Sequence, residues 1–191
     1  MKLPSPIVLA SASPRRQALL RQLGAAFVVH PSGVDEVILP NELPTRHVQR
    51  LAYEKALDVR FKVNTGVVLG ADTIVVLDNN ILNKPVDAAD ARRMLSILSG
   101  RTHTVYTGYA VMDTQSSRCV CDYAATQVTF RTLAEDEIAE YVAGGSPLDK
   151  AGAYGIQDDF GAVFITRIDG CYYNVVGLPI TRLYLTLRTF V

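Results

Sequence analysis

The sequence has no net charge, because 19 basic residues balance 19 acidic ones, and no uninterrupted apolar run approaches the ~20 residues of a membrane span. A balanced charge gives no support for binding to nucleic acid or to a membrane surface. Residues 1–6 also lack the apolar segment of a secretory signal. We therefore expect a cytoplasmic protein that associates with neither membrane nor nucleic acid.

Cysteine is scarce, and the spacing of Cys119, Cys121 and Cys171 matches no zinc motif and no complete disulfide set. We expect free thiols in a reducing compartment. The Walker pattern and the Gly-x-Gly-x-x-Gly pattern are both missing, so the P-loop and Rossmann classes are poorly supported. The histidines are scattered and form no clustered metal motif.

A chain of 191 residues that is 49% hydrophobic can bury a substantial core, and its length favours one domain, residues 1–191, with two lobes. Apolar runs and helical patterns alternate, which predicts an α/β protein with a partly antiparallel sheet. Strands are expected at 7–10, 27–29, 66–77, 102–112 and 118–131, with a later hairpin joining 162–168 to 171–176. Helices are expected from Pro14 to a stop at Gly24, from a Thr45 cap to Arg60, from an Asp87 cap to Leu98, from a capping box at residues 132–135 to Val142, and after Pro179.

The most informative stretch is residues 7–20, a short apolar run followed by small polar residues and a helix start. Ser13 fits the N-cap position and Pro14 the first helical position. Arg15 and Arg16 then fall in the first turn, where the helix dipole favours acidic side chains. Either these are two solvated surface arginines, or an anion such as phosphate binds at this helix end.

A second informative stretch is the apolar, β-branched run of residues 66–77, which predicts strands buried on both faces. Asp72 lies in its middle, and a carboxylate there must be paired, hydrogen-bonded or metal-bound. It either caps backbone groups at a bend or serves as a general base or metal ligand. Residues 78–80 predict a tight turn, after which Lys84 could return beside Asp72.

Three further features suit phosphate chemistry, each with a plainer alternative. Lys55 falls at the edge of the apolar stripe of its helix, where it either snorkels or reaches from the core-facing side into a cleft. Asp35 and Glu36 follow a turn, and are either solvated or ligands of Mg²⁺. The glycine-rich loop 146–157, with its Asp149–Lys150 pair, is either a surface turn or part of the site. Together the cations and carboxylates favour an α/β enzyme that handles phosphate.

Four motifs strongly resemble the Maf family of nucleoside triphosphate pyrophosphatases: residues 11–16 (SASPRR), 70–73 (GADT), 84–85 (KP) and 149–157 (DKAGAYGIQ). The resemblance runs from about residue 7 to the last helix. It implies a mixed, elongated sheet in two lobes with a central cleft, as in the inosine triphosphate pyrophosphatases. It also implies hydrolysis of a nucleoside triphosphate to monophosphate and pyrophosphate with Mg²⁺ or Mn²⁺, and a homodimer.

The resemblance also assigns roles to residues. Asp72 matches the proposed general base, which would orient water or hold the metal. Glu36 matches a carboxylate that helps to bind metal. The residues that match the phosphate-binding set, expected to stabilise charge on the departing pyrophosphate, are Ser11, Arg15, Arg16, Lys55 and Lys84.

Base specificity is expected from Arg15, Thr73 and Gln157, which resemble the residues of the subgroup that prefers dTTP and UTP. The alternatives are 7-methyl-GTP or a broad range of nucleotides on the same chemistry. A different class is a nucleotide-binding regulator of septum formation, the process from which the family takes its name. Residues 158–160 (DDF) depart from the family pattern and could alter specificity, for example toward cytidine or modified pyrimidine nucleotides.

Overall fold

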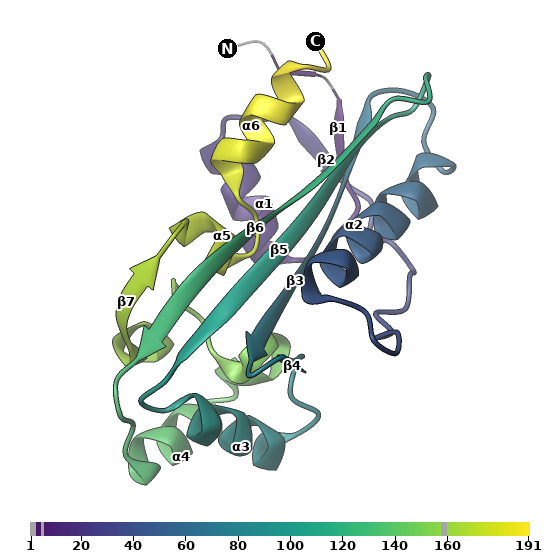
Figure 1. The fold of residues 1–191 in the computed structure, drawn as a ribbon. Helices are drawn as coiled ribbons and strands as arrows, with labels where there is room; N and C mark the ends of the chain where they lie inside the picture. Colours follow the sequence, from purple (N-terminus) through teal and green to yellow (C-terminus); the bar gives the residue numbers. More distant parts are fainter. Residues whose placement is uncertain (1–2, 5, 158–159) are drawn as a thin grey trace. The chain divides into compact units, whose positions relative to one another are not determined.

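The computed structural model describes residues 3–4, 6–157 and 160–191, which form an α/β fold around a seven-stranded mixed sheet (Figure 1). The strand order is β2-β1-β3-β5-β6-β7, with β4 paired to β3. The strands are β1 (Ile7–Leu9), β2 (Phe27–Val29), β3 (Val67–Leu77), β4 (Asn80–Leu82), β5 (Thr102–Asp113), β6 (Cys119–Phe130) and β7 (Ile165–Asp169). β1 is parallel to β2 and β3, whereas β4 is antiparallel to β3, and β7 to β6.

The described residues also form six α-helices and three short 3₁₀ helices. The α-helices are α1 (Pro14–Gln22), α2 (Pro44–Arg60), α3 (Ala88–Leu98), α4 (Glu135–Ala143), α5 (Tyr172–Val176) and α6 (Ile180–Arg188). The 3₁₀ helices are η1 (Ser146–Asp149), η2 (Ala151–Ala153) and η3 (Phe160–Phe164). Within the described part of the chain, none of these helices has both the length and the apolar character needed to cross a membrane.

The chain divides into two compact units. Unit 1 comprises Met1–Asp72, Thr107–Ala124 and Gly177–Val191, and unit 2 comprises Thr73–Tyr106 and Ala125–Val176. Strands β3, β5 and β6 each contribute residues to both units. Whether the whole chain is one domain of two lobes stays a prediction.

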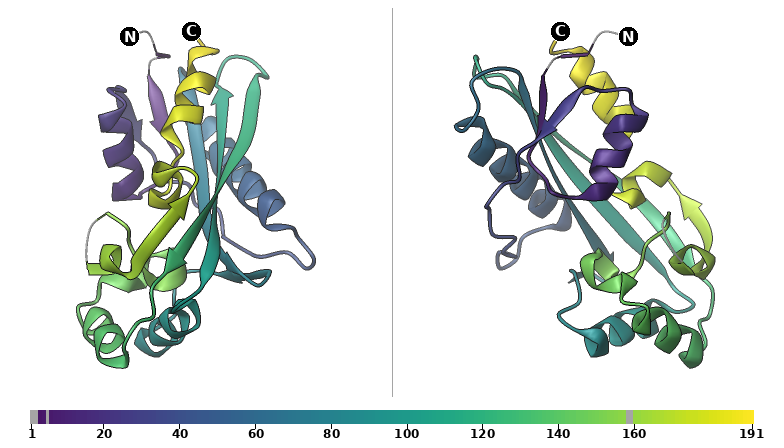
Figure 2. Two further views of the ribbon diagram at one scale, coloured as in Figure 1. Left: turned by 60° about the vertical axis from the view of Figure 1, so that its left-hand side comes forward. Right: turned by 180° about the vertical axis from the view of Figure 1, so that it is seen from behind.

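In unit 1, α2 covers one face of the strands while α1 and α6 lie on the other (Figure 2). The apolar face of α2 packs closely because the facing strands carry glycine. A Cβ at Gly70 of β3 would lie 2.1 Å from the Ala52 carbonyl oxygen, and one at Gly108 of β5 would lie 2.3 Å from that of Val48. These two glycines therefore bring the backbone of α2 against the sheet, and with it the side chains of that helix face.

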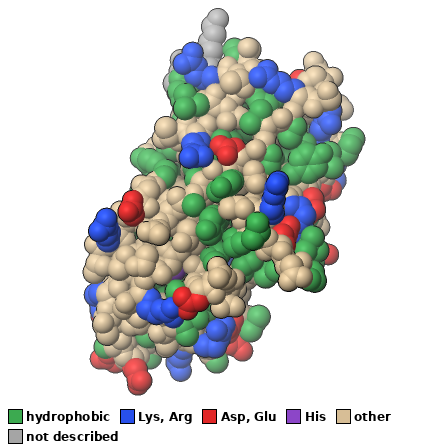
Figure 3. All heavy atoms as spheres, viewed as in Figure 1, with side chains coloured by type: hydrophobic (Ala, Val, Ile, Leu, Met, Phe, Trp, Pro, Cys, Tyr) green, Lys and Arg blue, Asp and Glu red, His purple; other side chains and the backbone are tan. Residues whose placement is uncertain are grey.

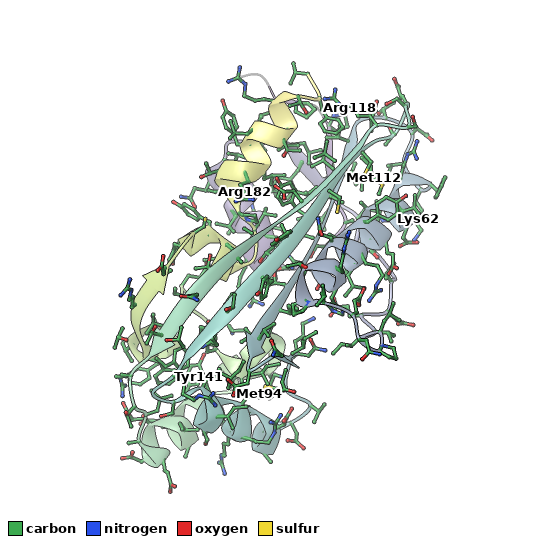
Figure 4. All side chains as sticks on the ribbon, in the orientation of Figure 1. Lys62, Met94, Met112, Arg118, Tyr141 and Arg182 are labelled. Carbon is green, nitrogen blue, oxygen red and sulfur yellow. The ribbon has the colours of Figure 1, made fainter. Side chains whose placement is uncertain are left out.

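Unit 2 has its own core, formed where α3 and α4 pack beside the strands. Met94 of α3 and Tyr141 of α4, 4% and 5% exposed, belong to one hydrophobic cluster and are labelled in Figure 4. Phe130 and Phe164 extend the cluster, with ring centroids 6.0 Å apart. On the surface seen in Figure 3, basic and acidic side chains are interspersed among apolar ones, in keeping with the zero net charge.

Several local predictions are confirmed. The side chain of Ser13 accepts a hydrogen bond from the Arg16 N–H, and Pro14 occupies the first position of α1. Residues 78 and 79 have φ values of 48° and 64°, as a tight two-residue turn between β3 and β4 requires. The side chain of Asp87 caps α3 by accepting from the Asp90 N–H at 2.8 Å.

Two predicted helix starts are wrong. α2 begins at Pro44 with Leu43 as N-cap, so Thr45 lies inside the first turn. α4 begins at Glu135 rather than at Thr132, because Leu133 is 7% exposed and its N–H donates to the Ser99 hydroxyl at 2.8 Å. This tertiary anchor keeps the preceding residues outside the helix.

The predicted hairpin around Asp169–Gly170 is also wrong. β7 pairs with β6, and the residues that were expected to form the returning strand form helix α5. The cause is Asn174, which is fully buried and donates through Nδ2 to the Val105 carbonyl and the Thr126 hydroxyl, both at 2.9 Å. Because an unpaired buried amide is costly, these bonds favour the conformation that makes them.

Candidate active site

The centre of the candidate site in unit 1 is a lysine that contacts two carboxylates. Lys55 Nζ donates to Asp72 Oδ1 at 2.7 Å and to Glu36 Oε1 at 2.6 Å. The side chains of Lys55 and Asp72 are 8% and 7% exposed, whereas that of Glu36 is 46% exposed. The arrangement is thus a buried ion pair that opens toward solvent at Glu36.

The local sequence explains why this lysine is buried. Lys55 lies on the apolar face of α2, between Ala52 and Ala56, and Gly70 lets that face approach β3 two residues before Asp72. Lys55 therefore reaches Asp72 from the core-facing side of its helix rather than snorkelling away. The carboxylate of Asp72, which had to be paired, hydrogen-bonded or metal-bound inside an apolar strand, forms an ion pair with this lysine.

Arg16 joins the same group of residues. Its Nη1 donates to the Ser11 hydroxyl at 3.1 Å, and its Nε donates to the Gly177 carbonyl at 3.0 Å. Burial lowers the pKa of Arg16, while the negative charges of Asp72 and Glu36 act to raise that pKa. Arg16 is therefore close enough to both carboxylates to interact with them electrostatically.

Arg15 lies half-buried on the same first turn of α1, and its positive charge also acts to lower the pKa of Arg16. α1 has no acidic residue in this turn. We call Ser11, Arg15, Arg16, Glu36, Lys55 and Asp72 the unit 1 cluster. The structure thus brings six of the predicted site residues together in one unit.

The other predicted site residues belong to unit 2. Thr73 is half-buried in β3, directly after Asp72, and the side chains of Lys84 and Gln157 are exposed. The Gly152 N–H donates to the Asn83 carbonyl at 3.1 Å, which joins the loop that leads to Gln157 to the segment that carries Lys84. The return of Lys84 beside Asp72 stays a prediction.

Comparison with known proteins identifies the family. The family described as "Maf-like protein" matches residues 6–190. The chain belongs to the Maf family. Curated relatives named "dTTP/UTP pyrophosphatase" include one from Moorella thermoacetica, 50% identical over 97% of this chain and 95% of the relative, and one from Clostridioides difficile, 48% identical over 93% and 91%. A third, from Bacillus cytotoxicus, is 50% identical over 96% of this chain and 94% of its own.

One feature of this Maf protein that sequence reasoning missed is the support of the loop that carries Glu36. Arg50 of α2 donates through Nε to Glu42 at 2.6 Å and through Nη2 to the Val37 carbonyl at 2.9 Å. Its hydrogen bond to Glu42 lowers the pKa of that carboxyl to about 2. The Arg50–Glu54 pair has the i,i+4 spacing that a sequence can reveal. No such spacing in the sequence reveals the contacts that Arg50 makes with the loop.

The Gly177 carbonyl was missed for the same reason, because it lies 161 residues from Arg16, the side chain that binds it. The unexpected carboxylates at Asp158 and Asp159 lie outside the described residues. Phe160, the third residue of that departure, is 55% exposed in η3 and packs its ring 5.9 Å from that of Phe164.

The carboxylates fit a divalent cation in part. Glu36 and Asp72 each place an oxygen within 2.7 Å of the same Lys55 ammonium, so the two carboxylates lie close together and offer hard oxygens of the kind that Mg²⁺ prefers, although the ammonium fills the point where these two oxygens meet. Among the described residues, no group of three or more His, Cys, Asp or Glu side chains is arranged to hold a metal. Mg²⁺ commonly takes one or two carboxylates and completes its shell with waters and substrate phosphates. The donor set suits that mode of binding.

Proposed function

We propose that this Maf-family protein is a dTTP/UTP pyrophosphatase that hydrolyses the nucleotide to its monophosphate and pyrophosphate and so removes unwanted nucleotides. The observation that carries the proposal is the buried Lys55–Asp72 pair, with Glu36 and Arg16 beside it, in a chain about half identical to enzymes of that name. A buried carboxylate held by a lysine beside arginines provides both a proton acceptor and an anion site.

In the proposed reaction, Asp72 orients a water molecule for attack on the α-phosphorus. Lys55 holds Oδ1, so we assign the water to Oδ2. The bond from water oxygen to phosphorus forms as the bond to the β-phosphate oxygen breaks. The carboxylate takes the proton of the water and pyrophosphate leaves. Lys55 here positions the carboxylate, in addition to its predicted role toward phosphate.

The cations of the cluster stabilise the charge that develops on the leaving group. Arg16 is held in place by the Ser11 hydroxyl and the Gly177 carbonyl, and Arg15 lies on the same first turn of α1. Fixed donors of this kind need no reorganisation during the reaction, which makes them effective. We assign Lys84 the same role, stabilisation of the charge on the leaving group. In the alternative in which Asp72 holds the metal, Mg²⁺ or Mn²⁺ on Glu36 and Asp72 would neutralise part of the phosphate charge and would itself orient the water.

Base selection is assigned to Arg15, Thr73 and Gln157. Threonine and glutamine both offer a donor and an acceptor to the edge of a pyrimidine ring. A site built around such bonds rejects a base that leaves them unpaired. The cytoplasmic location, the homodimer and the central cleft that the resemblance implies stay predictions.

The experiment is pyrophosphate release with Mg²⁺ or Mn²⁺ from dTTP, UTP, CTP and 7-methyl-GTP. Wild type, Asp72→Asn and Asp58→Asn are compared, since Asp58 is also paired to a lysine in unit 1, at 2.7 Å from Lys62. We expect Asp72→Asn to lose at least ~100-fold in turnover and Asp58→Asn to match wild type.

Equal rates for wild type and Asp72→Asn would remove Asp72 as the base. A preference for 7-methyl-GTP would contradict the choice of base, and tight nucleotide binding without turnover under either metal would favour a binding regulator.

A further inference from the structure

A buried histidine and a buried tyrosine in unit 2, neither of them part of the unit 1 cluster, share a hydrogen bond. His103 of β5 is 2% exposed, and its Nε2 lies 2.8 Å from the hydroxyl of Tyr154, which is 6% exposed. Both rings meet Phe130 edge-on, with centroids at 5.0 and 4.8 Å. Tyr154 lies three residues before Gln157, so the bond anchors the loop that carries a proposed base-binding residue.

Burying this polar pair among apolar side chains lowers the stability of the fold. The second ring nitrogen of His103, Nδ1, is buried and has no hydrogen-bond partner among the described residues. Neither tautomer satisfies both nitrogens, because Tyr154 can serve only one of them. Burial lowers the pKa of His103 to about 4, so the ring is neutral at pH 7.

Two phenylalanines could fill the same space against Phe130 without leaving a polar atom unpaired. Replacing both partners of a buried hydrogen bond by apolar groups of similar shape is often nearly neutral for stability. Packing alone therefore does not explain the pair. Proteins usually keep an exception to the rule that buried polar atoms are hydrogen-bonded, in spite of its cost to stability, at functional positions.

The loop has two further anchors, both through its backbone. Gly152 adopts φ +69°, its N–H donates to the Asn83 carbonyl, and a Cβ there would lie 2.9 Å from Val75. The Gly155 N–H donates to the hydroxyl of Tyr141 at 3.2 Å. Tyr154 thus lies between two fixed backbone points and supplies the side-chain anchor just before Gln157.

We propose that His103 and Tyr154 are positioning residues that hold the loop of residues 150–157 so that Gln157 meets the base of the nucleotide. The proposal rests on the function proposed above. It assigns the pair no part in the chemical step, whose proton transfer is given to Asp72 in unit 1. Disturbing the pair should weaken nucleotide binding and base discrimination while leaving kcat nearly unchanged.

The test compares Tyr154→Phe with the double variant His103→Phe/Tyr154→Phe. KM, kcat and the UTP-to-CTP ratio of kcat/KM are measured, with the melting temperature and the affinity for the non-hydrolysable α,β-imido-UTP. Tyr154→Phe should raise KM and Kd about fivefold, the equivalent of one hydrogen bond, and lower the ratio by a similar factor. Its melting temperature should also fall, because both His103 nitrogens then lack a partner.

The double variant separates positioning from packing. We expect it to recover the melting temperature of wild type, since no polar atom is left unpaired, and still to bind α,β-imido-UTP about fivefold more weakly. Tyr109→Phe is the matched control, since its hydroxyl is 3.0 Å from that of Thr186 in unit 1. It should leave KM and the base ratio unchanged.

Recovery of affinity and base ratio along with the melting temperature would show a purely structural pair and overturn the proposal, as would wild-type values in Tyr154→Phe. Gln157→Ala adds a second check. If Tyr154 acts through Gln157, the two substitutions together should cost less than the sum of their separate effects, whereas additive losses would contradict the mechanism. If wild type binds α,β-imido-UTP but hydrolyses no UTP, the proposed function fails, and the binding measurements still decide the role of the pair.

Discussion

Acid should destabilise this protein through His103 in a pH window that lies mostly above that of its carboxylates. Burial lowers the pKa of His103 from 6.5 to about 4, so the unfolded chain binds a proton at a higher pH than the folded chain does. Above pH 6.5 the ring is neutral in both states and contributes nothing to pH dependence. As the pH falls from 6.5 to 4, the unfolded state gains the proton first, and stability is lost.

The size of the loss follows from the shift. A difference of about 2.5 pKa units at about 1.4 kcal/mol per unit gives a loss of about 3 kcal/mol, complete near pH 4. The rings of Phe130 and Tyr154 pack against His103; phenylalanine has no ionisable group and burial raises the pKa of Tyr154, so neither is charged in this range. Because His103 is 2% exposed, solvent offers little screening.

The measurement is urea unfolding between pH 7.5 and 4.5, followed by circular dichroism, for wild type and His103→Phe. The carboxyls of Glu42 and Glu137 have pKa values lowered to about 2 by their arginine partners, so their stabilising contribution is lost below pH 4.5 and in both proteins alike. Wild type should lose about 2 kcal/mol more than the variant by pH 4.5. Parallel loss in the two proteins would refute the assignment of a neutral, buried ring.

Three further substitutions test how the candidate site is built, each by urea unfolding. Gly70→Ala should destabilise by about 3 kcal/mol, because the new Cβ would lie 2.1 Å from the Ala52 carbonyl oxygen; a stable variant would show that α2 can move away. Lys55→Met should cost about 3–5 kcal/mol by leaving the Asp72 charge buried without its lysine, and adding Asp72→Asn should recover part of that loss. No recovery would argue against an ion-pair origin. Ser13→Ala should cost about 1 kcal/mol through loss of the α1 cap, and an unchanged midpoint would count against that cap.

Features set by neighbours in sequence could be predicted well. The cap at Ser13, the turn at residues 78–79 and the apolar face of α2 each depend on a few adjacent residues, and the structure has all three. The same kind of signal failed where a distant contact was stronger. The capping-box pattern at residues 132–135 does not start the helix at Thr132, because the Leu133 N–H donates to the Ser99 hydroxyl.

The candidate site shows the same division. Asp72 could be predicted as a site residue because it is a carboxylate in an apolar strand. Lys55 could be predicted because it is a cation at the edge of the apolar stripe of its helix. That Lys55 contacts both Asp72 and Glu36 could not be predicted, because the contact depends on how closely α2 approaches β3. Gly70 sets that distance, yet a glycine in a strand does not reveal which backbone lies against it.

The charge balance of the unit 1 cluster indicates what else the proposed reaction needs. Arg15, Arg16 and Lys55 carry three positive charges, and Glu36 and Asp72 carry two negative ones, so the formal sum is only one positive charge. The positive end of α1 adds a fraction of a charge. A triphosphate carries several negative charges, which this cluster alone does not balance. A divalent cation on Glu36 and Asp72 would turn those two carboxylates from a source of repulsion into ligands. We therefore expect the metal to matter for holding the nucleotide as well as for the chemical step.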